Sequence, residues 1–440
     1  MKIIFVSLGC DKNLVDSEMM MGLLKEKGYE FTDDEREADI AVINTCGFIT
    51  SAKEESIQAI LEMAENKKGN LKALIAAGCL AQRYKDEILK ELPEIDAVVG
   101  TTAFDKICEV VEDVLAKRGH SEFRDINGLC RPNAKRIITT GGCYSYLKIA
   151  EGCDKRCTYC SIPLFKGSYR SVPMEKLLEE AEYLAQSGVR ELILVAQETT
   201  VYGVDLYKKK TLPTLLRGLC GIDGIRWVRL LYCYPEEITD ELIDVIKSEP
   251  KICRYLDIPI QHASDGILRR MGRRTTNADL RDIIGKLRRE IPDVALRTTL
   301  ITGFPGESEE DYAVLTDFAD EMEFDRLGVF TYSPEEGTPA AAMEGQLDEE
   351  TKLARRDGIM ELQQEISLER SQRLVGQRLE VIIEGRAADE EVYVGRTYMD
   401  APGVDGYIFI NSDEELMSGD FVYVRVTKAL EYDLIGELDR

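Results

Sequence analysis

Short apolar segments alternate with amphipathic, helix-like segments along most of this 440-residue chain, and that alternation constrains its fold more than any other feature. Alternation of this kind predicts parallel sheets with helices packed against them. It occurs once over residues 1–120 and again over residues 142–371. The intervening residues 121–141 are punctuated by Gly and Pro and predict a linker. We therefore expect an α/β protein with more than one domain, since a chain of this length exceeds one ordinary hydrophobic core.

The first alternation predicts an N-terminal doubly wound parallel-sheet domain. Its expected strands are Lys2–Ser7, Asp39–Asn44, Leu71–Ala77 and Asp96–Val99. Its expected helices are Leu14–Lys27, Ala52–Asn66, Lys85–Leu92 and Phe104–Lys117. In such a domain, ligands bind beyond the carboxyl ends of the strands.

The second alternation predicts a partial TIM-like (β/α) barrel. Its expected strands are Glu191–Ala196, Trp227–Leu231, Tyr255–Ile258, Ala295–Ile301 and Arg326–Thr331. Its expected helices are Met174–Ser187, Glu236–Ser248, Thr276–Arg289 and Leu347–Leu374.

The tail, residues 372–440, changes character and predicts a small antiparallel β-barrel, because short β-type runs are separated there by Gly, Asp and Asn turns. These runs are Leu379–Glu384, Val392–Thr397, Gly406–Ile410 and Phe421–Ala429.

Composition limits the classes of function. A net charge of −25 disfavours a protein that grips nucleic acid through a broad basic surface. No apolar run reaches the roughly 18 residues that span a bilayer, and the N-terminus has no secretory pattern. We therefore expect a cytoplasmic protein in a reducing compartment. Twelve cysteines and only two histidines then favour thiolate-bound iron–sulfur chemistry over disulfides or a His-rich metal site.

The strongest single motif is Cys153-Asp-Lys-Arg-Cys157-Thr-Tyr-Cys160, a CxxxCxxC triplet. Three thiolates on one tight loop can bind three irons of a 4Fe–4S cluster and leave the fourth iron open for the amine and carboxylate of an amino acid. The ferredoxin run has a different spacing and a full ferredoxin cluster has a fourth cysteine. Cys157-x-x-Cys160 alone would also suit zinc, which remains the alternative.

This stretch resembles the loop of the radical S-adenosylmethionine (SAM) superfamily, in which the reduced cluster cleaves SAM to methionine and a 5′-deoxyadenosyl radical. The resemblance implies that Tyr159 lies beside the adenine. Further candidates follow predicted strands, where barrel sites lie, although each could instead satisfy a turn or loop. The predicted cofactor contacts are Tyr159, Gln197, Glu198, Gln261, Arg297, Gly303, Gly306 and Glu307.

Three cysteines of the first domain, Cys10, Cys46 and Cys79, each follow a predicted parallel strand and adjoin a glycine. The carboxyl ends of neighbouring strands share one edge of a sheet, so three thiolates can converge there on a second cluster with an open iron. A free cysteine is also a common small buried hydrophobe, which is the alternative. The other cysteines show no such spacing and are read as packing residues: Cys108, Cys130, Cys143, Cys220, Cys233 and Cys253.

A radical loop, a second three-cysteine site and a C-terminal β-barrel together resemble the methylthiotransferase family over essentially the whole chain. The resemblance implies that Cys153, Cys157 and Cys160 hold the radical-generating cluster, that Cys10, Cys46 and Cys79 hold the auxiliary cluster, and that the tail is a TRAM-type barrel. It also implies two 4Fe–4S clusters and SAM as cofactors, with an electron donor such as flavodoxin or ferredoxin and a separate sulfur donor.

Two substrate classes compete within that family, a tRNA adenosine and a protein side chain. The run from Lys12 to Glu18 resembles the ribosomal-protein branch, although Asp11 stands where proline is usual. Residues 371–440 carry 7 Lys or Arg and 15 Asp or Glu, which suits a basic ribosomal protein better than RNA phosphates. The basic run Arg269–Arg274 could contact RNA or a substrate carboxylate, or could be a solvated helix end paired with nearby acids.

The branch resemblance implies methylthiolation of the β-carbon of an aspartate in a small-subunit ribosomal protein, held by the acidic barrel without direct tRNA or membrane binding. The alternatives are a tRNA adenosine methylthiotransferase and, more remotely, a two-cluster electron carrier.

Overall fold

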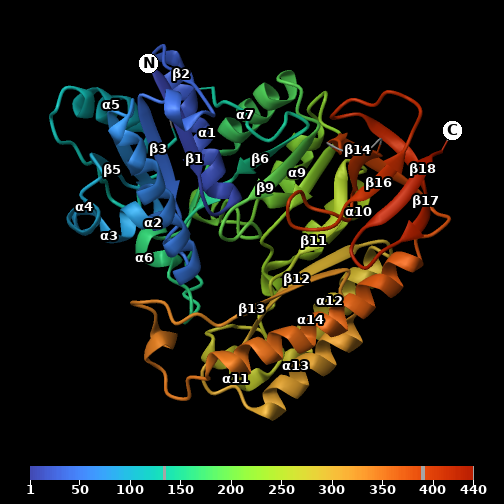
Figure 1. Ribbon diagram of the computed structural model, residues 1–440. Helices are drawn as coiled ribbons and strands as arrows, with labels where there is room; N and C mark the ends of the chain where they lie inside the picture. The colour runs from blue at the N-terminus through green and yellow to red at the C-terminus, as the bar shows by residue number, and fades with distance from the viewer. Residues whose placement is uncertain (132–134, 388–391, 440) are drawn as a thin grey trace. The chain divides into compact units, whose positions relative to one another are not determined.

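The computed structural model describes residues 1–131, 135–387 and 392–439, which form two compact units (Figure 1). The first unit comprises Met1–Thr139, Ala150–Val172 and Ser333–Ala341. The second comprises Thr140–Ile149, Pro173–Tyr332 and Ala342–Arg440. Two segments inside the predicted range 142–371 thus belong to the same compact unit as the N-terminal domain, namely Ala150–Val172 and Ser333–Ala341. Parts of the predicted linker 121–141 and tail 372–440 lie outside the described residues.

A parallel sheet in the order β2-β1-β3-β4-β5 forms the centre of the first unit. This is the strand order of doubly wound flavodoxin-type sheets, and it confirms the predicted fold. Nearly every residue of the central strands β3 and β4 is buried, because helices cover both faces of the sheet. These strands therefore lack the alternation of apolar and polar residues that is typical of a sheet with one face in solvent. The strands are β1 (Lys2–Ser7), β2 (Glu30–Phe31), β3 (Ile40–Thr45), β4 (Ala73–Gly78) and β5 (Ala97–Val99).

Helices of the first unit lie on both sides of this sheet (Figure 1). α2, α3 and α4 share one hydrophobic core with the sheet, in which Ile60 and Leu80 pack against Ile43 and Leu74. α1 packs against α5. The helices are α1 (Asp11–Glu26), α2 (Thr50–Ala64), α3 (Cys79–Tyr84), α4 (Asp86–Glu91), α5 (Ile107–Leu115) and α6 (Ile162–Lys166). The strands β7 (Ala150–Glu151) and β8 (Arg170–Ser171) pair antiparallel at the base of the cysteine loop.

The second unit is built on a parallel sheet in the order β13-β12-β11-β10-β9-β6, which is an open, partial barrel within the described residues. Its strands are β6 (Tyr144–Lys148), β9 (Glu191–Val195), β10 (Trp227–Leu230), β11 (Ile252–Asp257), β12 (Ala295–Thr302) and β13 (Arg326–Thr331). Its helices are α7 (Met174–Gln186), α8 (Val204–Tyr207), α9 (Leu212–Cys220), α10 (Asp240–Ser248), α11 (Asp265–Arg270), α12 (Asn277–Glu290), α13 (Glu309–Met322) and α14 (Glu349–Gln372).

A closed β-barrel in the order β14-β15-β16-β18-β17 follows, as the tail predicts, but it is not wholly antiparallel, because β16 and β18 pair in parallel. It shares a continuous hydrophobic core with the sheet, because Trp227 and Tyr255 of the sheet pack in one cluster with Val381 and Ile408 of the barrel. The barrel is therefore an integral part of the second unit. Its strands are β14 (Arg378–Arg386), β15 (Val392–Thr397), β16 (Ile408–Asn411), β17 (Phe421–Ala429) and β18 (Leu434–Leu438).

Local departures from the predicted elements have local causes. α10 begins at Asp240 and not at Glu236, because the Thr239 side chain accepts a hydrogen bond from the Leu242 amide and caps the helix there. α3 starts at Cys79 directly after β4 and is too short for helical periodicity to reveal it. No helix within the described residues is long and apolar enough to cross a membrane.

Candidate cluster and cofactor sites

The three cysteines of the first domain lie where the sequence predicts them. Cys10 is the N-cap residue of α1, directly after β1 and Gly9. Cys46 follows β3, and Cys79 is the first residue of α3 after β4. β1 and β3 are the neighbouring strands at which the chain reverses its direction of travel across the sheet, which is where doubly wound folds bind ligands.

Glycines allow these three loops to approach one another closely. Gly9 has φ +87°, and a Cβ added to it would lie 2.9 Å from the Cys46 sulfur. A Cβ on Gly47 would lie 2.9 Å from the backbone nitrogen of Leu80, next to Cys79. Side chains at either glycine would therefore force the cysteine loops apart.

Asn13 of α1 connects the same three loops, and sequence analysis did not identify it. Its amide nitrogen donates to the carbonyls of Leu8 and Thr45, each at 3.1 Å, and its Oδ1 lies 3.5 Å from the Cys79 sulfur. The residue is buried. Its signal in the sequence is its place in the run Lys12–Glu18, which carries the branch resemblance.

The donor chemistry of this group fits an iron–sulfur cluster. Burial raises the pKa of the Cys79 and Cys46 thiols, and each also feels the charge of Cys10. Both thiols are therefore neutral at pH 7 unless a bound metal stabilises the thiolate. Two buried thiols and the half-buried thiol of Cys10, together on one sheet edge, are a suitable set of ligands for such a group.

Cys153, Cys157 and Cys160 lie on the loop of the first unit that follows β7. Gly152 has φ +80°, and a Cβ there would collide with the carbonyl of Ser168. The Cys153 amide donates to the carbonyl of Gly167 at 3.1 Å, and the Thr158 carbonyl accepts from Ala340 at 2.9 Å. These contacts hold the loop in a tight turn.

The Cys160 amide donates to the Cys157 carbonyl at 3.1 Å, which places these two cysteines in one turn of the loop, and burial raises the pKa of the Cys160 thiol. Within residues 1–131, 135–387 and 392–439, no three His, Cys, Asp or Glu side chains lie close enough together to bind one metal ion. A 4Fe–4S cluster needs a wider arrangement, because each thiolate binds a different iron. Both triplets therefore fit a cluster by donor type and by convergence.

The predicted cofactor contacts divide between the units. Tyr159 is half-buried on the cysteine loop of the first unit, and the others belong to the second, where Arg297 lies within β12 and the rest follow strands. Gln197 and buried Glu198 follow β9, and Glu198 accepts a hydrogen bond from the Thr200 amide at 3.2 Å. Gln261 has φ +72° and bridges to β12. The positions of Gln197, Glu198 and Gln261 after parallel strands are confirmed, while their contact with SAM stays a prediction.

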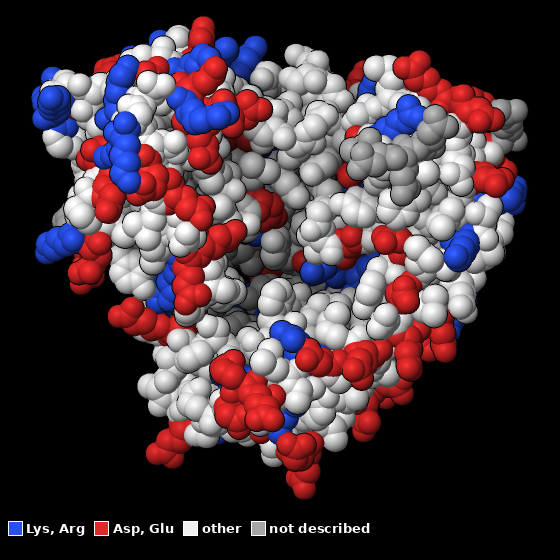
Figure 2. Space-filling model, in the orientation of Figure 1, with Lys and Arg blue, Asp and Glu red and all other residues white. Residues whose placement is uncertain are grey.

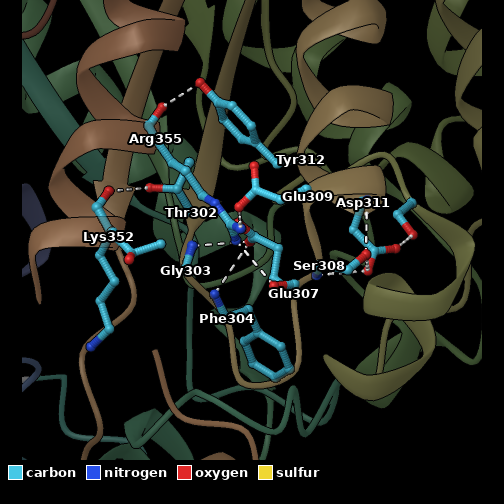
Figure 3. Close-up of polar contacts among 12 residues, drawn as sticks. Thr302, Gly303, Phe304, Glu307, Ser308, Glu309, Asp311, Tyr312, Lys352 and Arg355 are labelled. Atoms are coloured by element: carbon cyan, nitrogen blue, oxygen red, sulfur yellow. Dashed lines mark hydrogen bonds and ion pairs between the residues drawn. The ribbon is translucent and has the colours of Figure 1, made fainter. Parts of the chain in front are cut away.

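Glu307 closes a turn directly after β12 (Figure 3). Its carboxylate accepts hydrogen bonds from the amides of Gly303 at 2.9 Å and Phe304 at 3.3 Å. Arg355 of α14 donates to its other oxygen at 2.8 Å, and buried His262 lies 3.4 Å away. Burial alone would raise the pKa of Glu307, but these partners together hold it below its usual value.

The two glycines of this turn accommodate protein side chains. Gly303 has φ +72° and its open side is filled by Lys352, while Gly306 has φ +79° and lies over the guanidinium of Arg270. These contacts explain why glycine is needed at both positions. A structural role for the turn is thus observed, and a cofactor role for its backbone stays a prediction.

Replacing Glu307 by Ala is expected to lower the free energy of unfolding by about 3 kcal/mol, because two buried amides lose their acceptor and Arg355 loses its buried carboxylate partner. Chemical denaturation at neutral pH measures the effect. Glu309→Ala is the matched control, since Glu309 also pairs with Arg355 but its side chain is 85% exposed. It should cost less than about 1 kcal/mol. Equal losses for the two variants would contradict the role assigned to Glu307.

Arg297, a predicted cofactor contact, is engaged by carboxylates. Its guanidinium donates to Asp257 at 2.7 Å and lies 3.3 Å from Asp405, which comes from the C-terminal barrel. The arginine side chain is only partly exposed. The structure therefore assigns Arg297 a role in joining the barrel to the sheet, and contact with SAM stays a prediction.

The run that carries the branch resemblance is mostly buried. Asn13, Asp16, Ser17 and Glu18 are all inaccessible, and Glu18 binds Arg136 at 2.9 Å. These residues therefore do not form an exposed surface for a substrate, and among them Asn13 connects the cysteine loops.

Three domain families match the chain in the order that the fold shows. Residues 2–100 match the uncharacterized protein family UPF0004, residues 147–319 the radical SAM superfamily and residues 375–438 the TRAM domain. A ribosomal protein uS12 methylthiotransferase RimO of Lachnoclostridium phytofermentans is 64% identical over 99% of both chains. That of Clostridioides difficile is 49% identical over 100% of this chain and 99% of its own.

The chain belongs to the RimO family of radical SAM methylthiotransferases. As a member of the family it is a transferase whose cofactors are 4Fe–4S clusters and SAM. The C-terminal barrel is a TRAM domain.

Solved structures share the fold at low sequence identity. The radical SAM methyltransferase TsrM from Kitasatospora setae, with cobalamin and a 4Fe–4S cluster bound, has a TM-score of 0.57 at 14% identity over 88% of this chain and 77% of its own. The cobalamin-dependent radical SAM enzyme OxsB has a TM-score of 0.54 at 12% identity over 82% of this chain and 56% of its own. They agree with an α/β radical SAM architecture.

Proposed function

We propose that this enzyme transfers a methylthio group to the β-carbon of an aspartate in ribosomal protein uS12. The observation that carries the proposal is the presence of two convergent three-cysteine sites in a chain that is 64% identical to a uS12 methylthiotransferase over nearly its whole length. One site would generate a radical and the other would carry sulfur, which is the combination that insertion of sulfur at an unactivated C–H bond requires.

We assign Cys153, Cys157 and Cys160 to the radical-generating cluster, and Cys10, Cys46 and Cys79 to the auxiliary cluster. When bound with SAM, the first cluster supplies a 5′-deoxyadenosyl radical that removes a hydrogen atom. The task of the chain's own residues is to bind and orient. Gly152 and Gly167 hold the radical loop in its turn, and Asn13 holds the loops of the auxiliary site.

Acidic surface supports a basic protein partner. In the lower part of the face drawn in Figure 2, where Figure 1 draws α13 and α14, acidic side chains predominate. Five exposed acids come from α13 alone: Glu309, Glu310, Asp317, Asp320 and Glu321. Ribosomal proteins are basic because they bind RNA, so such a surface attracts them and repels RNA phosphates.

The TRAM barrel contributes less exposed acid than its composition indicates. Asp400 and Asp405 are buried in ion pairs with Arg326 and Arg297. Four exposed acids in the described part of the barrel lie on the loop between β16 and β17: Asp413, Glu414, Glu415 and Asp420. We propose this loop as the part of the barrel that faces uS12.

The basic run Arg269–Arg274 gives little support to a tRNA substrate. Arg270 fills the space beside Gly306 and donates to the carbonyl of Glu344 at 3.2 Å. Buried Arg273 lies over the ring of Tyr234 and donates to the carbonyl of Pro259 at 2.9 Å. Both arginines therefore serve the fold of the second unit.

Anaerobic reconstitution with iron and sulfide, then incubation with SAM and a one-electron reductant and mass spectrometry of a uS12 peptide and of tRNA, tests the proposal. We expect the aspartate of the peptide to gain one methylthio group in place of one hydrogen, and tRNA to remain unmodified. A peptide with that aspartate replaced by Ala is the control. Methylthiolation of tRNA alone would show that the enzyme belongs to the tRNA-modifying branch of the family. Absence of 5′-deoxyadenosine would instead indicate an electron carrier.

We further propose that the enzyme works in the cytoplasm, where ribosomal proteins are available, and that it receives electrons from a flavodoxin or ferredoxin and sulfur from a separate donor.

A further inference from the structure

Lys166, the last residue of α6, is a buried cation of the first unit that the family resemblance does not single out. Its side chain is only 3% exposed. The ammonium lies 3.2 Å from the carboxylate of Glu151 and 3.6 Å from that of Asp16. A charge this deeply buried is costly unless nearby groups of opposite sign stabilise it.

One side of Lys166 faces the radical loop. Glu151, its closer partner, is the last residue of β7 and is followed directly by Gly152 and Cys153. The residue after Lys166 is Gly167, whose carbonyl accepts the hydrogen bond from the Cys153 amide at 3.1 Å. Lys166 is therefore attached to the base of the radical loop through both its side chain and the backbone beside it.

The other side faces the auxiliary site. Asp16 lies on α1, the helix that Cys10 caps, and α6 packs against α3, which begins at Cys79. The charge of Lys166 interacts with the thiols of Cys10, Cys46 and Cys79.

Two hydrogen bonds fix α6 in this place. The Thr101 hydroxyl donates to the Phe165 carbonyl at 2.9 Å, and the Ser161 hydroxyl donates to the Phe48 carbonyl at 3.0 Å. Burial on its own opposes the charged form of Lys166, but Glu151, the cysteines and Asp16 more than offset this and raise the pKa of the ammonium above its usual value. With carboxylates at 3.2 and 3.6 Å, Lys166 is a cation at neutral pH.

A fixed buried charge changes the redox behaviour of a cluster. Reduction adds one electron to a group that three thiolates already make negative, and a nearby cation stabilises the reduced form more than the oxidised form. We propose that Lys166 raises the reduction potential of the auxiliary cluster by holding a positive charge beside Cys10, Cys46 and Cys79. The proposal rests on the cluster assignment made above, and it makes Lys166 a positioning residue that links the two cluster sites.

The test uses the full chain with Cys153, Cys157 and Cys160 all replaced by Ala, so that only the auxiliary cluster is present. Electron paramagnetic resonance of the reduced cluster is followed as the applied potential is varied. In this background Lys166→Met should raise the ratio of oxidised to reduced cluster at a given potential at least tenfold, which is a shift of about 59 mV for one electron. Lys166→Arg, which keeps the charge, should stay near the parent. Lys53→Met, which removes another largely buried ammonium of the same unit, one paired with Glu335, should leave the potential unchanged.

An unchanged potential in Lys166→Met, with the cluster present, would overturn the proposal. If that variant fails to fold or to bind iron, Asp16→Asn gives the decision, because it removes a negative charge and should shift the potential in the opposite direction. No shift in Asp16→Asn would overturn the proposal as well. Iron analysis of the chain in which only the three radical-loop cysteines are replaced distinguishes failure of this proposal from failure of the cluster assignment. If that chain binds no cluster, the assignment is refuted, and this proposal with it.

Discussion

Replacing Cys157 by Ala is expected to abolish the formation of 5′-deoxyadenosine from SAM, with a loss of at least about a thousandfold in rate, or about 4 kcal/mol of activation free energy. Cys157 is buried in a loop that presents three thiols, and two thiols do not hold a cluster with one open iron. Cys79→Ala should behave differently. It should still form 5′-deoxyadenosine but should transfer no methylthio group, because it disrupts only the auxiliary site. Chromatography of the nucleoside products and mass spectrometry of the peptide distinguish the two variants.

Cys108→Ala is the matched control for both substitutions. Cys108 is a buried cysteine of the same unit, on α5, and burial raises the pKa of its thiol to about 11. It has no place in either triplet, so its loss should leave both products unchanged and cost only a little stability. Continued formation of 5′-deoxyadenosine by Cys157→Ala would contradict the assignment of the radical cluster, and loss of both products in Cys108→Ala would show that cysteine removal damages the fold in general.

Features that depend on local periodicity were predictable from the sequence. Alternating strands and helices predicted both parallel sheets, and the positions of Cys10, Cys46 and Cys79 after strands followed from the same pattern. Strand order in a parallel sheet places these three residues at one edge, so their convergence needed no knowledge of side-chain contacts.

Contacts between distant charged residues were not predictable, because a buried ion pair has no periodic signature. Glu191 and Arg396 are 205 positions apart, and a charged residue in a strand looks in the sequence like an exposed one. Lys166 was not predictable for the same reason, because in the sequence its buried ion pairs have no signature and it resembles any basic residue at the end of a short helix. Net charge likewise does not reveal pairing, since Asp400 and Asp405 of the barrel are paired with Arg326 and Arg297.

Replacing Glu191 by Gln is expected to lower the free energy of unfolding by about 3–5 kcal/mol, because the buried Arg229 guanidinium loses its carboxylate partner and Arg396 keeps only Glu384. The Glu191 carboxylate binds Arg229 of β10 and Arg396 of β15, each at 2.7 Å, and all three side chains are fully buried. Arg229 also donates to the carbonyl of Tyr398 at 2.6 Å. The carboxylate thus joins the radical SAM sheet to the TRAM barrel in the middle of their shared hydrophobic core.

Urea denaturation at pH 7 measures this loss. Burial alone would raise the pKa of Glu191, but the two guanidiniums hold it below its usual value, so its contribution to stability is fully present above about pH 4.5 and is lost only as the pH falls through the lowered pKa. Glu241→Gln removes a carboxylate from an exposed pair with Arg217 and should change stability by less than about 1 kcal/mol.

A triple variant gives the sharpest form of this test. Replacing Glu191, Arg229 and Arg396 together by apolar residues of similar size removes both ion pairs and leaves neither arginine charge in the core. This variant should recover most of the stability that Glu191→Gln loses. Recovery would show that the loss comes from uncompensated buried charge. A triple variant as unstable as Glu191→Gln would show instead that the ion pairs themselves hold the barrel on the sheet, since a well-packed apolar contact could not replace them.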